Sequence, residues 1–134
     1  MSLGTWDPDA DAAAHDAGIE TAVLSRFIQI ARDEMLPQLA DMLLEDEQQI
    51  YAGMMQLEAD DWLAAAANLN DDEVLQLLRF FAVAENLPGW EAGPKSPVIP
   101  LAKTLRKRGV RLDKIQLQWL RDVNKNRFLP YGPL

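Results

Sequence analysis

The chain contains no cysteine and a single histidine among its 134 residues. Without cysteine it can form no disulfide, offers no thiol nucleophile and cannot bind zinc through sulfur. The histidine, His15, lies in an acidic N-terminal segment, whereas a catalytic triad needs an imidazole held by a packed scaffold. One histidine also cannot complete a helical di-metal site, which takes a Glu-x-x-His motif from each of two helices. We therefore expect no catalytic residues, no cofactor and no metal.

Signals for phosphate loops, membrane spans and secretion are missing too. The seven glycines are scattered, and no Gly-Lys-Ser or Gly-Lys-Thr of a phosphate-binding loop occurs. No apolar run approaches the roughly 18 residues of a membrane span. Residues 1–11 have neither the basic nor the apolar stretch of a secretory signal. These absences predict a cytoplasmic protein with no membrane contact.

Charge is distributed very unevenly along the chain. Residues 1–94 carry 3 basic and 19 acidic side chains, a formal charge of −16, and residues 95–134 carry 10 basic and 2 acidic ones, a charge of +8. The two values sum to the overall −8. Either the two parts neutralise each other within the fold, which is the interpretation we favour, or the basic part faces an anionic partner.

Apolar residues recur at helical spacing, and no segment alternates with the period of a strand. The pattern predicts a single compact all-α domain of about six helices. We expect a helix over 19–36, a helical stripe over 39–57 that is interrupted at the acidic run 45–47, and further helices over 60–68, 70–86, 100–109 and 113–125. The segment 70–86 leaves little polar face, so it should lie at the centre of the core.

Composition divides the domain into parts. The expected order is a disordered acidic arm at 1–18, acidic helices at 19–86, a Pro/Gly loop at 87–97, a basic helical hairpin at 98–127 and an apolar tail at 128–134. We expect the arm to be dispensable for stability.

Two helix starts have the pattern of a capping box, Asn70 with Glu73 and Asp113 with Gln116. The two helix starts also precede segments of similar sequence, because a shift of 42 residues superimposes 75–79 on 117–121. The similarity is compatible with two related helical hairpins. Chance recurrence of amphipathic patterns explains it equally simply.

The basic segment is the strongest candidate for a binding surface. Its density of lysine and arginine is typical of nucleic-acid-binding proteins. A helix-turn-helix around Gly109 would, however, bury polar positions such as Thr104 and Gln118, and the acidic part of the chain would repel phosphate. Trp90 lies in the Pro/Gly loop, where binding residues concentrate. The candidate interaction surface comprises Trp90, Lys103, Arg106, Lys107, Arg108, Arg111 and Lys114.

These observations favour a non-catalytic helical interaction domain that binds a protein partner or a second copy of itself. A nucleic-acid-binding regulator that uses the basic hairpin is the first alternative, and an enzyme that uses core carboxylates is the second. A protein-binding role predicts a contiguous apolar patch beside the charges. An enzyme predicts a deep pocket that holds buried carboxylates with perturbed pKa values.

Overall fold

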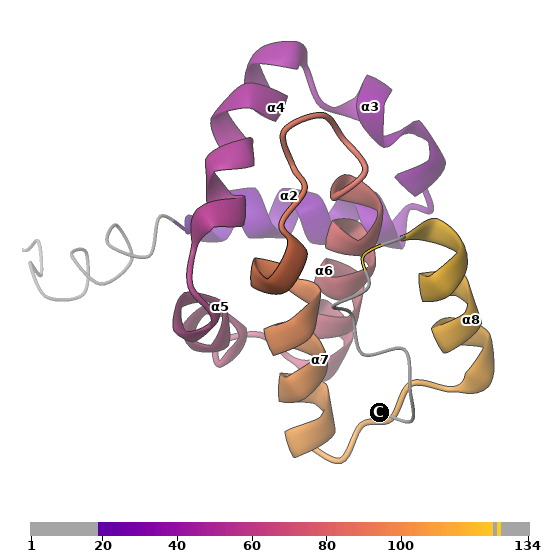
Figure 1. Ribbon diagram of the computed structural model, residues 1–134. Coiled ribbons are helices and arrows are strands. Elements are labelled where there is room, and N and C mark those ends of the chain that lie inside the picture. The colour runs from indigo at the N-terminus through magenta and orange to yellow at the C-terminus, as the bar shows by residue number, and fades with distance from the viewer. Residues whose placement is uncertain (1–18, 125, 127–134) are drawn as a thin grey trace, which may run out of the picture.

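The computed structural model describes residues 19–124 and 126, and it is all-α (Figure 1). Helices account for 71% of these residues, and none of them is in a strand. The expectations for the acidic arm at 1–18 and the apolar tail at 128–134 lie outside the described residues.

Seven α-helices and three short 3-10 helices follow one another within the described part. The α-helices are α2 (Thr21–Arg32), α3 (Leu39–Met42), α4 (Glu45–Ala52), α5 (Ala59–Ala66), α6 (Asp71–Ala84), α7 (Val98–Lys107) and α8 (Lys114–Val123). The 3-10 helices are η1 (Leu36–Gln38), η2 (Gly53–Gln56) and η3 (Gly93–Lys95).

Helix α6 is the centre of the fold, as its nearly continuous apolar sequence predicts. It begins with the predicted capping box, in which the Asn70 side chain accepts a hydrogen bond from Glu73 N and the Glu73 carboxylate accepts one from Asn70 N. Helices α2, α7 and α8 pack around α6 (Figure 1). Seven of its 14 residues are buried, so this helix can be stable only inside the assembled domain.

Aromatic side chains join α6 to the rest of the core. The ring of Phe27 on α2 stacks on Phe80 with centroids 4.1 Å apart, and Phe81 meets Trp62 of α5 edge-on at 5.0 Å. All four side chains have no exposed surface. Edge-to-face and offset aromatic pairs add about 0.5–1.5 kcal/mol beyond the burial of their area.

The first part of the chain breaks into more pieces than its apolar stripe predicts. The helix expected over 19–36 ends at Arg32, and Glu34 takes a positive φ of 57°. The stripe over 39–57 is divided at Leu43 and Leu44, whose backbone is extended. The acidic run from Glu45 then opens α4, and the Glu47 carboxylate accepts a hydrogen bond from Leu44 N. The acids therefore mark a helix start, where the helix dipole favours them.

The predicted pairing of short and long helices into hairpins is only partly visible. The order of short helix, capped turn and second helix does occur twice, as α5–α6 and as α7–α8. The main packing crosses between these pairs, however, because α5 packs against α7, and α7 and α8 each pack against α6. Helices α7 and α8 of the basic segment are thus connected mainly through their packing on α6, and they do not form a self-contained hairpin.

None of the helices in the described part of the chain is long and apolar enough to cross a membrane.

Candidate functional site

Trp90 is not on the surface, so the sequence-based assignment of this residue to an interaction surface is wrong. Its side chain has no exposed area and lies 6.4 Å, centroid to centroid, from both Phe27 and Phe80. Its indole Nε1 donates a hydrogen bond of 2.9 Å to the backbone oxygen of Gln48. The Pro/Gly loop therefore folds inward at this point and fixes α4 to the core.

Arg108 has a structural role within the basic segment. Its guanidinium donates to the backbone oxygens of Leu69 and Ala66 at 2.9 and 3.0 Å, and to the Asp71 carboxylate at 3.1 Å. The two carbonyls belong to the end of α5 and to the turn before α6, and Ala66 O also accepts a hydrogen bond from Leu69 N at 2.9 Å. Arg108 thus ties the end of α7 to the α5–α6 turn.

The other five predicted cations remain exposed: Lys103, Arg106, Lys107, Arg111 and Lys114. Within the described residues none of them forms an ion pair, whereas Lys95 pairs with Glu58 at 3.1 Å and Arg108 with Asp71. Among the described residues, Lys95 and Arg108 are therefore paired with acidic side chains, whereas the five cations named above are presented to solvent.

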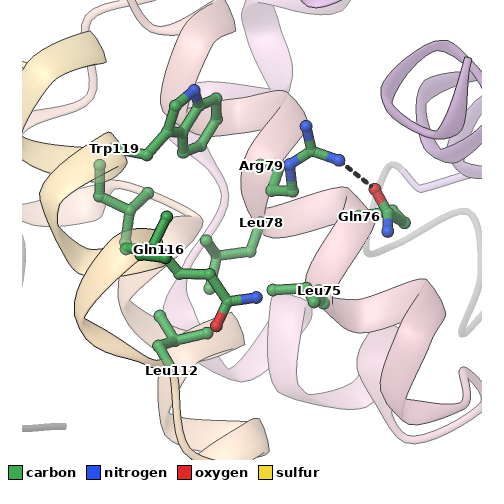
Figure 2. A pocket seen from close by; sticks show the side chains of 9 residues that line it. Leu75, Gln76, Leu78, Arg79, Leu112, Gln116 and Trp119 are labelled. Atoms are coloured by element: carbon green, nitrogen blue, oxygen red, sulfur yellow. Dashed lines mark hydrogen bonds between the residues drawn. The ribbon is translucent and has the colours of Figure 1, made fainter. Parts of the chain in front are cut away.

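Next to two of these cations, Arg111 and Lys114, an apolar groove runs between α6 and α8. It has a volume of about 300 Å³. Its lining consists of Leu75, Gln76, Leu78, Arg79, Leu112, Ile115, Gln116, Trp119 and Leu120. Figure 2 shows Trp119 and Arg79 facing each other at one end, with Leu75, Leu78 and Leu112 further along.

The capped start of α8 forms one wall of this groove. The Asp113 carboxylate accepts a hydrogen bond from Gln116 N at 2.7 Å, and the Gln116 side chain accepts one from Asp113 N at 2.9 Å. Only Leu120 of α8 is buried, so the helix lies against α6 by a narrow edge. Ile115, which faces the groove mouth, stays 80% exposed and is the most exposed large apolar side chain among the described residues.

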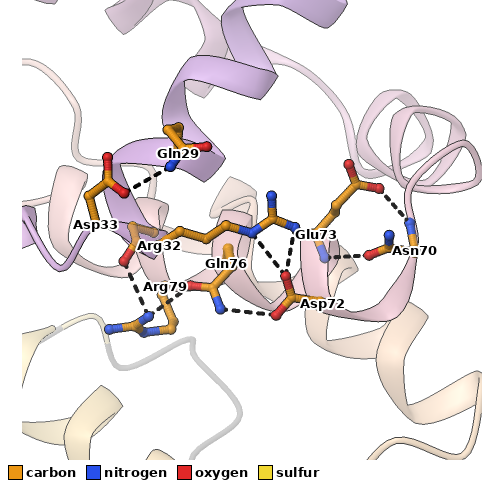
Figure 3. Close-up of polar contacts among 9 residues, drawn as sticks. Gln29, Arg32, Asp33, Asn70, Asp72, Glu73, Gln76 and Arg79 are labelled. Carbon is orange, nitrogen blue, oxygen red and sulfur yellow. Dashed lines mark hydrogen bonds and ion pairs between the residues drawn. The ribbon is translucent and has the colours of Figure 1, made fainter.

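The other wall is held by polar contacts between α2 and α6. Arg79 contacts Glu34 at 3.0 Å and Gln76 at 2.7 Å, and its guanidinium carbon lies 5.3 Å from the ring centre of Trp119. Figure 3 shows the neighbouring contacts, among them the ion pair of Arg32 with Asp72 at 2.6 Å. Arg79 is therefore oriented before any ligand arrives, and it holds Trp119 in place by a cation–π contact.

A second hollow continues on the far side of this pair. It has a volume of about 410 Å³ and shares Arg79 and Trp119 with the first hollow, while η1 contributes Leu36 and Pro37. The groove and the second hollow together extend along α8 for more than one turn of helix, and the Arg79–Trp119 contact lies between them.

A buried carboxylate, the feature that an enzyme would require, is present at Glu85. Burial raises its pKa, against the lowering effect of hydrogen bonds from Ser96 and Asn126. Ser96 Oγ donates to Glu85 Oε2, and Asn126 Nδ2 donates to Oε1 at 3.2 Å. Asn126 also donates to the Gly93 backbone oxygen at 2.9 Å. Glu85 thus joins the end of α6 to η3 and to the segment after α8.

This cluster does not form an acid–base pair. Glu91 lines the same open hollow but is exposed, and the raised pKa of Glu85 has burial as its cause rather than a second carboxylate. No group of three or more potential metal-ligating side chains occurs in the part of the chain that the structure describes. The chemistry of the cluster is that of a structural hydrogen-bond acceptor.

Comparison with known proteins adds no relationship: no family model matches the chain, and no curated protein or solved structure is significantly similar to it. Function must therefore be inferred from the surface itself. The groove was not predicted from the sequence, because neither Trp119 nor Ile115 was among the candidate residues. The available signal was the position of Ile115, which lies off the apolar stripe of Leu117 and Leu120.

Proposed function

We propose that the protein is a non-catalytic interaction domain, and that the groove between α6 and α8 binds an acidic amphipathic helix of a partner protein. The observation that carries the proposal is Ile115, which is 80% exposed at the mouth of an apolar groove. Apolar side chains that border a groove in this way mark interaction sites, and a grooved helix pair is a common receptor for the apolar face of a helix. We place this protein in the cytoplasm.

The charge preference follows from the two cations at the start of α8. Arg111 and Lys114 are exposed and lie on either side of the groove residue Leu112 and the helix cap. The acids of this segment are already engaged, since Asp113 caps α8 and Asp122 accepts a hydrogen bond from Gln118 at 3.0 Å. Unpaired positive charge beside the groove favours acidic partners, chiefly through faster association and rejection of basic ones.

The test uses a synthetic acidic amphipathic helix as the probe, with a charge-reversed peptide of identical apolar residues as its counterpart. Binding is followed by NMR through the indole and backbone signals of Trp119 and its neighbours. The acidic peptide should shift these signals, and the basic peptide should not. Ile115→Asp should abolish the shifts. Ala64→Asp, a change at an exposed position of α5 outside the groove, is the matched control and should leave them intact.

Shifts that map to other faces of the molecule would contradict the proposal. So would shifts that persist in Ile115→Asp, or equal binding of the two peptides. Because Ile115 is 80% exposed, the Ile115→Asp protein should fold normally, and its one-dimensional NMR spectrum verifies this before titration.

A further inference from the structure

The four exposed large apolar side chains of the described residues come from two separate parts of the chain. Ile115 lies at the α6–α8 groove, and the others are Met42, Leu44 and Ile50, which are 36%, 70% and 70% exposed. The last three belong to the end of α3, the connection to α4 and α4 itself. This second surface, the α4 surface, consists of these three residues with Glu45 and Asp46.

The α4 surface is acidic and apolar on the same helical face. Asp46 and Ile50 are four residues apart, so they lie one above the other along α4. Glu45 and Asp46 are exposed and form no ion pair within the described residues. This turn of helix therefore offers the groove at α8 an apolar contact through Ile50 and carboxylates of opposite sign to Arg111 and Lys114.

Helix α4 is held firmly in this presentation. Arg26 of α2 pairs with the Glu47 carboxylate and donates to the backbone oxygen of Met42 at 3.0 Å. Gln48 donates to the backbone oxygens of Ala40 and Leu43 at 3.1 and 3.0 Å. The Trp90 indole fixes the backbone of Gln48 from the core side. A helix that is already ordered before binding loses little conformational entropy when it associates, and this favours association.

We infer that the occupant of the α6–α8 groove is α4 of a second copy of this chain, an inference that rests on the proposed function of the groove. Ile50 and Leu44 of one copy would cover Ile115 and Trp119 of the next. Glu45 and Asp46 would face Arg111 and Lys114. Within one copy α4 and α8 are not among the helix pairs that pack closely, and Figure 1 shows them at different sides of the domain.

The two surfaces differ, so the association is head-to-tail. Each copy would use its groove for one neighbour and its α4 surface for another. Such heterologous contacts build open chains or closed rings, whereas a contact of the groove with itself would stop at a symmetric dimer. The number of copies in the assembly should therefore distinguish the head-to-tail arrangement from the symmetric dimer.

The test breaks each surface in a separate full-length chain. The variants are Ile50→Asp and Ile115→Asp, and Ala64→Asp on the exposed side of α5 is the matched control. Mass is measured by sedimentation equilibrium across a concentration series. The wild type and Ala64→Asp should exceed the mass of a dimer as concentration rises. Each interface variant should stay at 15.0 kDa, because its self-affinity falls by more than about tenfold.

An equimolar mixture of the two variants gives the decisive result. Ile50→Asp keeps an intact groove and Ile115→Asp keeps an intact α4 surface, so one interface can form between them. The mixture should reach the mass of a heterodimer and stop there. A mixture that stays monomeric overturns the inference. A symmetric dimer that Ile115→Asp destroys and Ile50→Asp preserves overturns it as well, and assigns the groove to self-contact.

Failure of this inference is separable from failure of the proposed function. If the wild type is monomeric at its highest soluble concentration but the acidic peptide still shifts the Trp119 signals, the second copy is the wrong partner and the groove remains a receptor. If neither peptide nor second copy binds, both proposals fail.

Discussion

Glu85 is the residue at which burial and charge conflict most directly. Its side chain is buried, no described residue forms an ion pair with it, and its pKa is raised by that burial. The folded state therefore binds a proton more tightly at Glu85 than the unfolded chain does. Stability from this group is fully present below its unfolded pKa of about 4.3 and is lost as the pH rises through the raised folded value.

Glu85→Gln should accordingly become more stable relative to the wild type as the pH rises from about 4 towards neutrality. Urea unfolding of both proteins at each pH measures this difference. The comparison is needed because Glu47 and Asp72, whose pKa values are lowered by hydrogen bonds from Arg26 and Arg32, contribute the opposite slope in both proteins. Glu91→Gln, an exposed neighbour, should track the wild type. A difference that shrinks with rising pH would contradict the sign.

Arg108 and Lys107 are sequence neighbours with opposite expected roles. Arg108 satisfies two backbone oxygens and Asp71, whereas Lys107 is exposed and forms no ion pair within the described residues. Arg108→Ala should cost about 1–2 kcal/mol of unfolding free energy, because hydrogen bonds from a charged group are lost. Lys107→Ala should stay within about 0.5 kcal/mol, as is usual for surface changes. Equal losses in urea unfolding would mean that Arg108 does not brace the α5–α6 turn.

The roles of individual side chains could not be predicted from the sequence. Trp90 sits among prolines and glycines, so its neighbours indicate a surface loop. What buries it are Phe27, Phe80 and Gln48, all distant in sequence. Arg108 looks the same as Lys107 in a run of three cations, and only its proximity to Ala66 and Leu69 distinguishes it. Long-range contacts of this kind leave no local signal.

Whole elements were far more predictable, because caps act locally. Asn70 and Asp113 both accept the predicted hydrogen bonds, at 2.8 Å from Glu73 N and 2.7 Å from Gln116 N. Asn70→Ala and Asp113→Ala should each cost about 0.5–2 kcal/mol. Hydrogen exchange should show the loss at the starts of α6 and α8 respectively. Unchanged exchange at both starts would mean that the caps contribute nothing.

The elements that departed from prediction did so where periodicity and capping disagree. The apolar stripe over 39–57 predicts continuity up to an interruption at the acidic run 45–47, whereas the chain is already extended at Leu43 and Leu44. Glu47 competes with that continuity, since its carboxylate bonds to Leu44 N while Arg26 holds it from α2. A tertiary contact thus decides the break, and it also produces the exposed Leu44 that helps define the α4 surface.

At the scale of the whole molecule, the described part of the chain shows both outcomes of the charge division, since some cations of 95–124 are paired with acidic side chains and others are exposed. Two ion pairs, Lys95–Glu58 and Arg108–Asp71, join the basic segment to the acidic part among the described residues. The composition showed the division but could not show which cations would be covered, because coverage depends on the packing of α7 and α8 on α6.

The five exposed cations lead to the last prediction, which concerns nucleic acid. Phosphate binding needs several cations on one face and no strong field of opposite sign, and the chain carries a net charge of −8. We expect no gel shift with duplex or single-stranded nucleic acid at low salt, where such binding is strongest. Reversal of Arg106 and Lys107 to glutamate, which removes cations away from the groove, should leave binding of the acidic peptide unchanged. A shift that this double reversal abolishes, and that weakens steeply as salt is added, would instead favour a nucleic-acid-binding protein, because counterion release would then account for the affinity.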